Sequence, residues 1–280
     1  MKRLILKAAL TAALTACAGT GAMAAGLLEK ANAGETVRIG FANEVPWAYP
    51  GDGDAPKGFV NSIALGVLDK MGITNIEPVV TDWGGLIPGL NANRFDVITG
   101  GMYILGSRCE NVDFSEPIGV FGDAFIVAGG NPKGIQTYVD IRDKGAILVT
   151  GAGYNIVEVA KREGIADDNV MQVPGPTEIL AAVRAGRADA GGVTFFTARV
   201  LAEQAGGEID ITDPSLLPEW TLSWVGIGFR KDDDEFRSAF NAALKDYIGT
   251  DAMLAGVAEY GYTEHQLPGD VTMEYACANR

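Results

Sequence analysis

The sequence predicts an α/β protein of two lobes, each a mainly parallel sheet flanked by helices, joined by two crossings of the chain. Strand-like and helix-like segments alternate, which is typical of parallel sheets covered by helices. Two turn-rich segments, "AGGNPKG" at 128–134 and "TDPSLLPEW" at 212–220, offer places where the chain could leave one lobe and return to it. Beyond residue 24 the chain is long enough for one large domain or for two domains of ordinary size.

Residues 1–24 have the features of a secretory signal peptide and are set apart from the fold. A basic start at Lys2 and Arg3 precedes an apolar stretch at 8–18, and small residues at 22–24 form a cleavage site. The apolar stretch is too short to anchor the chain stably in a bilayer. We therefore expect an exported protein of the periplasm. The alternative is a lipoprotein signal, in which Cys17 becomes a lipidated first residue.

The individual elements follow from the spacing of apolar residues. Val37, Ile39 and Phe41 alternate as in a strand with one buried face, which predicts a first strand at 37–41. Further strands are expected at 76–81, 95–99, 124–128, 146–149, 170–173, 188–193 and 225–229. Helical spacing predicts helices at 63–71, 86–90, 156–162, 178–185 and 235–248.

The turn-rich segments define the expected domain boundaries. Lobe 1 would comprise 36–127 and 224–280, and lobe 2 would comprise 128–223. In such an arrangement a ligand binds in the cleft between the lobes, outside the carboxyl ends of the strands.

The charge balance excludes one class of partner. The formal net charge is −14, and removal of a leader with three basic residues and no acidic residue makes it −17. Because binding to phosphates needs a basic patch, we expect no nucleic-acid partner. An acidic surface suits an exported protein that must stay soluble.

Two cysteines remain beyond the leader, Cys109 and Cys277. In an oxidising compartment an even pair is most simply a disulfide, which would tie the C-terminal segment to the middle of the chain. Two unpaired thiols are the alternative. A metal site needs more ligands than these cysteines and the single His265 supply, so no metal is expected.

The motifs of common catalytic sites are mostly missing from the sequence. The sequence has a single histidine, near its C-terminal end, so a Ser–His–Asp or Cys–His catalytic site is not expected. "GAGYNI" at 151–156 has two glycines of a dinucleotide fingerprint but Ile156 where the third should stand. We therefore expect no cofactor and no enzymatic activity.

One stretch, "FDVITGGMYILGSRCENVDFSEPIG" at 95–119, predicts a site for a carboxylate. A strand and a glycine-rich exit lead to Arg108, just inside a short helix. Backbone N–H groups and a planar guanidinium then both face an anion. The alternative is that Arg108 pairs with Glu110 or Glu116 on the surface.

Several segments resemble the family 3 periplasmic solute-binding proteins of ABC importers. They are "GF" at 58–59, "GLIPGLNANRFDVITGGM" at 85–102, Arg108, "VDFSEP" at 112–117 and "AAVRAGRADA" at 181–190, in the family's order. The resemblance implies a type II fold, a monomer in which two α/β lobes close on a small solute about a hinge. It also implies ABC permease transmembrane subunits as partners and a role for Arg108 in holding the ligand carboxylate.

Two departures from the family pattern bear on the ligand. Amino-acid binders of the family place a small hydroxyl residue where this chain has Tyr103, and an acid for the α-ammonium where it has Thr194. An ammonium without a carboxylate partner is poorly satisfied in a closed cleft, so the pattern disfavours an ordinary α-amino acid.

Aromatic side chains take the place of those polar groups. Trp47, Trp83 and Tyr103 each follow a predicted strand, on the edge that faces the cleft. Three aromatic faces around one point suit a delocalised or methylated cation. The alternative for each ring is ordinary core packing.

This pattern resembles the ectoine/hydroxyectoine-binding subgroup, whose ligand carries an amidinium and a carboxylate on one ring. The resemblance implies that Glu44 accepts from the amidinium, that Trp47, Trp83 and Tyr103 enclose the ring, and that Arg108 pairs with the carboxylate. The loop with Gly153 and Asn155 would close over the carboxylate from the second lobe. The subgroup tends to have Phe or Tyr where this chain has its two tryptophans.

The sequence therefore predicts a binding protein that captures a zwitterionic cyclic compatible solute and passes it to a membrane permease. A binder of polar amino acids or opines is the alternative within the family. A cyclohexadienyl dehydratase-like enzyme, with Glu44 as general acid or base, is the alternative from another class.

Overall fold

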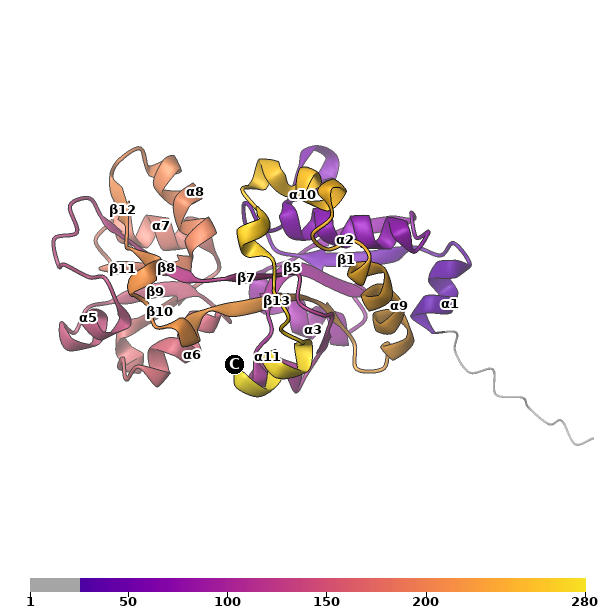
Figure 1. Ribbon diagram of the computed structural model, residues 1–280. Coiled ribbons are helices and arrows are strands. Elements are labelled where there is room, and N and C mark those ends of the chain that lie inside the picture. The colour runs from indigo at the N-terminus through magenta and orange to yellow at the C-terminus, as the bar shows by residue number, and fades with distance from the viewer. Residues whose placement is uncertain (1–25) are drawn as a thin grey trace, which may run out of the picture.

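A computed structural model describes residues 26–280, so the predicted leader and Cys17 lie outside the described residues. The chain forms two lobes, each built on its own sheet, which lie side by side in Figure 1. Within the described residues no helix combines the length and apolar character needed to cross a membrane.

The sheet of the first lobe has the order β4-β1-β5-β13-β6, with β7 also paired to β13. Its strands are β1 (Val37–Phe41), β4 (Ile76–Val80), β5 (Val97–Tyr103), β6 (Asp113–Phe114), β7 (Gly119–Phe121) and β13 (Ser223–Phe229). β4, β1 and β5 run parallel, whereas β13 is antiparallel to its neighbours. The sheet is therefore mixed, and the expected parallel pairing holds for its first three strands.

Helices cover this sheet and bury its apolar faces. They are α1 (Leu27–Asn32), α2 (Phe59–Lys70), α3 (Leu86–Asn91), α4 (Gly106–Cys109), α9 (Asp234–Lys245), α10 (Asp251–Val257) and α11 (Met273–Asn279). A small hairpin of β2 (Tyr49–Pro50) and β3 (Pro56–Lys57) precedes α2. Aromatic rings dominate the core beside the cleft, where Trp47, Phe59, Phe121 and Tyr262 pack together.

The sheet of the second lobe has the order β10-β9-β11-β8-β12. Its strands are β8 (Asp123–Ala128), β9 (Leu148–Gly151), β10 (Val170–Val173), β11 (Ala190–Thr194) and β12 (Ile209–Ile211). β10, β9 and β11 are parallel, and β8 is antiparallel to both β11 and β12. The flanking helices are α5 (Tyr138–Asp143), α6 (Asn155–Arg162), α7 (Pro176–Arg184) and α8 (Phe195–Ala205).

The first crossing lies at Gly122, between β7 and β8, so the expected boundary after residue 127 is wrong. β8 is buried and pairs with strands of the second sheet, which places 123–127 in the second lobe. The segment 128–134 is instead a turn within that lobe, where the Gly129 N–H donates to the Glu208 carbonyl. The second crossing runs from β12 to β13. Ser223 pairs with Phe121 of the first lobe, so the first lobe resumes at 223, one residue before the expected start at 224.

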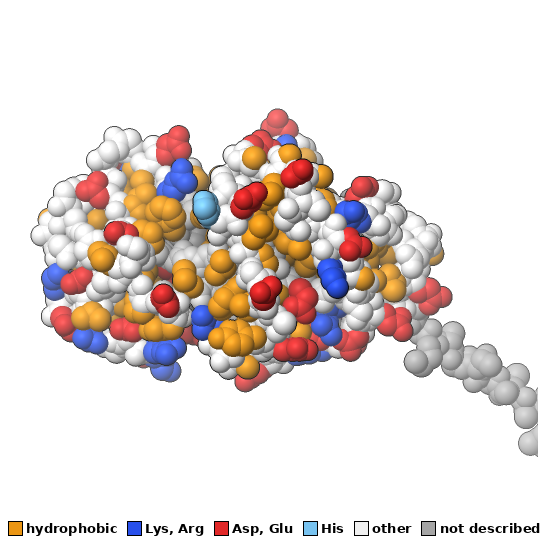
Figure 2. All heavy atoms as spheres, in the orientation of Figure 1, with side chains coloured by type: hydrophobic (Ala, Val, Ile, Leu, Met, Phe, Trp, Pro, Cys, Tyr) orange, Lys and Arg blue, Asp and Glu red, His pale blue; other side chains and the backbone are white. Residues whose placement is uncertain are grey.

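Figure 2 shows the two lobes as separate masses with a furrow between them. A crevice on the border is lined by residues of both lobes, among them Leu217 and His265. The cleft is thus bounded by the two crossings, and the side chains that follow the strands of both sheets meet inside it.

A cavity between the lobes

A small cavity between the lobes collects most of the predicted ligand-binding residues. Its lining comprises Glu44, Trp47, Trp83, Gly101, Tyr103, Arg108, Tyr154, Asn155 and Thr194. Seven of the eight predicted residues are in this set, and the carbonyl of the eighth, Gly153, contacts two of them. The cavity encloses about 20 Å³, room for about one water molecule. A solute of ring size therefore needs the lobes to part before it can enter.

Glu44 follows β1 and reaches across the cleft. Its carboxylate accepts hydrogen bonds from the Tyr154 hydroxyl at 2.7 Å and from the Thr197 hydroxyl at 2.8 Å, both on the second lobe. Burial raises the pKa of Glu44, and these two bonds oppose the shift. Both donors are neutral, so the carboxylate has no cationic partner among the described residues.

Trp47 is at once a wall of the cavity and part of the core. Its ring centroid lies 4.8 Å from that of Phe59 and 4.6 Å from that of Phe121, and only 2% of the residue is exposed. The indole N–H donates to the Thr194 hydroxyl at 3.0 Å across the cleft. Gly101 makes room for the ring, because a Cβ there would lie 2.5 Å from it.

Trp83 also lines the cavity, from a short turn before α3. Its indole N–H donates to the Gly153 carbonyl at 3.2 Å. The ring meets Tyr154 edge-on at 5.4 Å between centroids, and the Arg108 guanidinium lies 5.8 Å from the Trp83 centroid. Tyr154 therefore adds an aromatic ring that the sequence analysis did not assign to the site.

Arg108 is buried, and its guanidinium is held by backbone carbonyls of both lobes. Nη1 donates to the Tyr103 carbonyl at 2.9 Å, and Nη2 donates to the Gly153 carbonyl at 3.0 Å. Desolvation lowers the pKa of Arg108 to about 10. The alternative of a surface pair with Glu110 or Glu116 is wrong, since the side chain is turned inward and only 8% of the residue is exposed.

The second lobe contributes hydroxyl and amide groups. Thr194 caps α8, where its hydroxyl accepts from the Thr197 N–H at 3.2 Å. Asn155 begins α6, and its Nδ2 donates to the carboxylate of Asp123 at 2.7 Å. The amide of Asn155 is thus already bonded to a neighbour that the sequence analysis did not consider.

Asp123 is the acid that sequence reasoning missed. It opens β8 and pairs in register with Thr194 of β11, so an acid stands on the strand beside the position where the family pattern expects one. The residue is fully buried and its carboxylate also accepts from the Tyr138 hydroxyl at 3.5 Å. Burial raises its pKa to about 7. The sequence does show a carboxylate directly before a predicted buried strand. It does not show which strand pairs with that one, so the position of Asp123 beside Thr194 could not be predicted.

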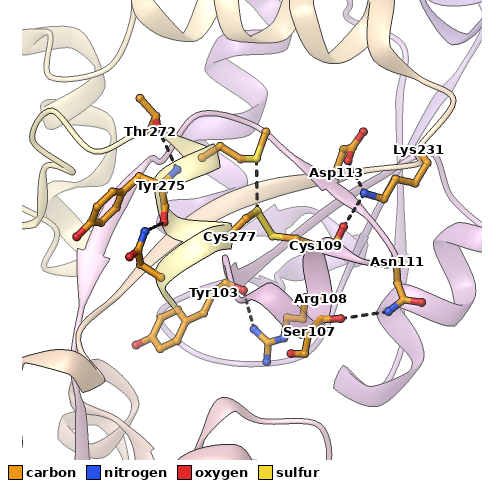
Figure 3. The surroundings of a disulfide bond; sticks show 12 residues. Tyr103, Ser107, Arg108, Cys109, Asn111, Asp113, Lys231, Thr272, Tyr275 and Cys277 are labelled. Carbon is orange, nitrogen blue, oxygen red and sulfur yellow. Dashed lines mark hydrogen bonds and ion pairs between the residues drawn. A yellow bond between two sulfur atoms is a disulfide. The ribbon is translucent and has the colours of Figure 1, made fainter.

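The predicted disulfide between Cys109 and Cys277 is confirmed, with Cα atoms 5.9 Å apart (Figure 3). It joins α4, which carries Arg108, to α11. The Gly106 N–H at the start of α4 also donates to the Arg280 carbonyl at 2.8 Å. Covalent and hydrogen-bonded links therefore hold the short helix that presents the arginine.

Two α/β lobes, two crossings and a charged aromatic cavity between them define a two-lobed solute-binding protein. The sequence matches the family described as "Bacterial extracellular solute-binding proteins, family 3" over residues 37–260, and the chain belongs to that family. The expected type II periplasmic binding protein fold is thereby confirmed. The coarse function follows with it: an extracytoplasmic solute-binding protein of the ABC importer class.

Individual relatives support the same class. A probable amino-acid ABC transporter periplasmic-binding protein of Sinorhizobium fredii, y4tE, is 34% identical over 260 residues, covering 90% of this chain and 86% of that protein. The L-cystine-binding protein TcyJ of Escherichia coli is 26% identical and covers 84% and 85%. The crystal structure of EhuB in complex with hydroxyectoine superposes with a TM-score of 0.82 and 26% identity, covering 91% of this chain and 98% of that one.

Loss of the disulfide should destabilise the first lobe. The bridge closes a loop of 168 residues in sequence, and the double substitution Cys109→Ala with Cys277→Ala is expected to lower the free energy of unfolding by about 2–5 kcal/mol. Urea denaturation with and without dithiothreitol measures this change. The reductant should have no effect on the double variant, and equal midpoints for the two oxidised proteins would contradict the expectation.

Asp123 should make stability depend on pH. Its pKa in the folded protein, about 7, exceeds the ordinary value of 3.8, so the folded state binds the proton more tightly. The stability that protonated Asp123 contributes to the folded state, on the order of a few kcal/mol, is fully present below about pH 4. It is lost as pH rises through 7. Denaturation of the wild type and Asp123→Asn between pH 4 and pH 8 should show the wild type losing stability relative to the variant. A constant difference would refute the assignment.

Proposed function

We propose that this protein captures a zwitterionic cyclic compatible solute, ectoine or hydroxyectoine, outside the cytoplasm and delivers it to an ABC permease. The observation that carries the proposal is the composition of the cavity. Four aromatic rings, one buried guanidinium and one buried carboxylate line the same small space. The protein would bind and release its ligand without chemistry and without a cofactor.

The charges of the cavity support a ligand that carries both signs. The donors of Arg108 meet only carbonyl oxygens, and the carboxylate of Glu44 meets only hydroxyl groups. Charge-assisted hydrogen bonds are about twice as strong as neutral ones, so a ligand carboxylate and a ligand amidinium would each improve on the present partners. Ectoine presents both groups on one ring.

The aromatic rings support a delocalised cation. Trp47, Trp83, Tyr103 and Tyr154 surround the cavity, and a cation over an aromatic face gains about 0.5–2 kcal/mol per ring. The likeness to EhuB, whose structure contains hydroxyectoine, agrees with this choice of ligand. A micromolar affinity corresponds to about 8 kcal/mol, more than the arginine bond alone supplies, so the rings must contribute.

The mechanism we propose is closure of the lobes about the two crossings. Glu44, Trp47, Trp83 and Arg108 belong to the first lobe, and each donates to or accepts from a residue of the second. A ligand that bonds to the same groups from between the lobes links them, and its higher affinity for the closed state shifts the equilibrium toward closure.

A polar amino acid or an opine is the second candidate, favoured by one observation. Asp123 stands beside Thr194 and could serve an α-ammonium in place of the acid missing at 194. Relatives named as lysine/arginine/ornithine-binding and octopine-binding proteins, at 28% and 25% identity, are consistent with this ligand class.

A dehydratase-like activity has weaker support. One similar structure is an ancestral amino acid-binding protein described as a precursor of cyclohexadienyl dehydratase, with a TM-score of 0.71 and 25% identity. Glu44 would be the acid or base in that case. Turnover of prephenate or arogenate that is lost in Glu44→Gln would establish it, and we expect none.

A ligand panel tests the proposal. Ectoine and 5-hydroxyectoine should each raise the melting temperature of the purified protein, as expected for a ligand that binds only the folded state. At a ligand concentration a hundredfold above Kd, such binding adds about 2.7 kcal/mol to the free energy of unfolding. Glutamine, arginine, proline and glycine betaine should have smaller effects. Stabilisation by amino acids and none by the ectoines would refute the proposed ligand.

Two substitutions test the assigned roles. Arg108→Ala should abolish stabilisation by the ligand, because the ligand carboxylate loses its cation. Trp47→Phe keeps an aromatic ring against Phe59 and Phe121 but removes the indole N–H, and it should weaken binding less than Trp47→Ala, for which about 1–2 kcal/mol is expected.

Trp224→Ala is the matched control, since this tryptophan lies in the first lobe outside the cavity and its N–H bonds to the Pro268 carbonyl. Isothermal titration calorimetry measures each affinity. Unaltered binding in Trp47→Ala would make that ring structural only.

A further inference from the structure

The first turn of α8 crosses the cleft and packs on the first lobe. The Phe196 ring lies edge-on to Phe121, with ring centroids 5.3 Å apart, and its centroid is 6.0 Å from that of Phe59. Thr194 caps the same helix, and Thr197, three residues further on, is 1% exposed. Aromatic packing therefore holds two threonine hydroxyls of the second lobe against the first lobe.

These hydroxyls form a chain of three hydrogen bonds that starts and ends on the first lobe. The indole N–H of Trp47 donates to Thr194 Oγ1 at 3.0 Å. Thr194 Oγ1 lies 3.0 Å from Thr197 Oγ1, which lies 2.8 Å from Oε1 of Glu44. The chain thus leaves the first lobe at Trp47, passes through the second lobe and returns at Glu44.

The chemistry of the two ends fixes the direction of this chain. An indole N–H can only donate, and an ionised carboxylate oxygen can only accept. Thr194 Oγ1 accepts from the indole and also from the Thr197 N–H at 3.2 Å, so its own proton is the one that joins it to Thr197 Oγ1. The Thr197 proton then points to Glu44. Each hydroxyl both accepts and donates, and bonds in such a chain strengthen one another.

The chain ends on the carboxylate that is proposed to meet the ligand cation. Oε2 of Glu44 accepts from the Tyr154 hydroxyl at 2.7 Å, so each carboxylate oxygen has a partner on the second lobe. An ionised carboxylate can accept about four hydrogen bonds, which leaves capacity for a ligand. Glu44 lines the cavity, whereas Thr197 is outside its lining. Thr197 can therefore act on a ligand only through Glu44.

We propose that Thr197 is a positioning residue, which orients the Glu44 carboxylate for the ligand and makes that orientation depend on closure of the lobes. The inference rests on the proposed function, because it takes Glu44 as the partner of the ligand cation. When the lobes part, Glu44 loses the two hydroxyl groups that hold it. Closure brings them back, and the closed cleft then meets the cation with a carboxylate that is already oriented. Part of the preference of the ligand for the closed state thus comes from a residue that the ligand does not touch.

Calorimetric titration with ectoine tests this role in two variants of Thr197. Thr197→Val keeps the shape of the side chain but removes the hydroxyl, and it should weaken binding about tenfold, the factor that roughly 1.4 kcal/mol supplies. Thr197→Ser keeps the hydroxyl and should retain most of the affinity. Because serine lacks the methyl group, a role in packing alone predicts the opposite order. Circular dichroism establishes that each variant is folded.

Ser107→Ala is the matched control. The Ser107 hydroxyl also donates from one lobe to a carboxylate of the other, that of Glu158 at 2.8 Å, but this pair is exposed and neither residue lines the cavity. Its affinity for ectoine should equal that of the wild type.

Three results would overturn the positioning role and leave the proposed function standing. They are equal affinities of the wild type and Thr197→Val, equally weak binding by Thr197→Val and Thr197→Ser, and a loss in Ser107→Ala as large as that in Thr197→Val. Failure of the folded wild type to bind either ectoine or 5-hydroxyectoine would overturn both.

Discussion

The buried guanidinium of Arg108 is the group on which the geometry of the cleft depends. It donates to a carbonyl of each lobe, that of Tyr103 in the first and that of Gly153 in the second. One planar cation therefore links the two lobes directly. A buried charge of this kind is tolerated only where its donors are satisfied. The short helix α4, its disulfide to α11 and the register of β5 all serve to fix that side chain in place.

The cleft brings charges together without pairing them with one another. Glu44, Arg108 and Asp123 each have neutral partners, and within residues 26–280 none of them takes part in an ion pair. Direct pairing would make the site more stable and less useful, since a ligand would have to displace a charged neighbour. Hydroxyl and carbonyl partners hold the charged groups in position and compete less strongly with a zwitterion.

The sequence predicted what depends on local pattern. The spacing of apolar residues located the longer strands but not the short strands β2, β3, β6, β7 and β12, and the glycine-rich exit of β5 pointed to Arg108. The first crossing was misplaced because the pairing of β8 with β11 joins residues some seventy positions apart, which no local signal reveals. Asp123, Tyr154 and Thr197 were missed for the same reason: each acts through a residue that is distant in sequence and becomes a neighbour only in the folded chain.

The two tryptophans of the cleft give the protein an optical reporter of its own. The indole N–H groups of Trp47 and Trp83 both donate to the opposite lobe, to Thr194 and Gly153. Parting of the lobes would transfer both N–H groups to water, whereas Trp220 and Trp224 lie outside the cavity. Emission wavelength and quenching by iodide would therefore follow the lobe movement in unlabelled protein, on the time scale of a stopped-flow mixing experiment.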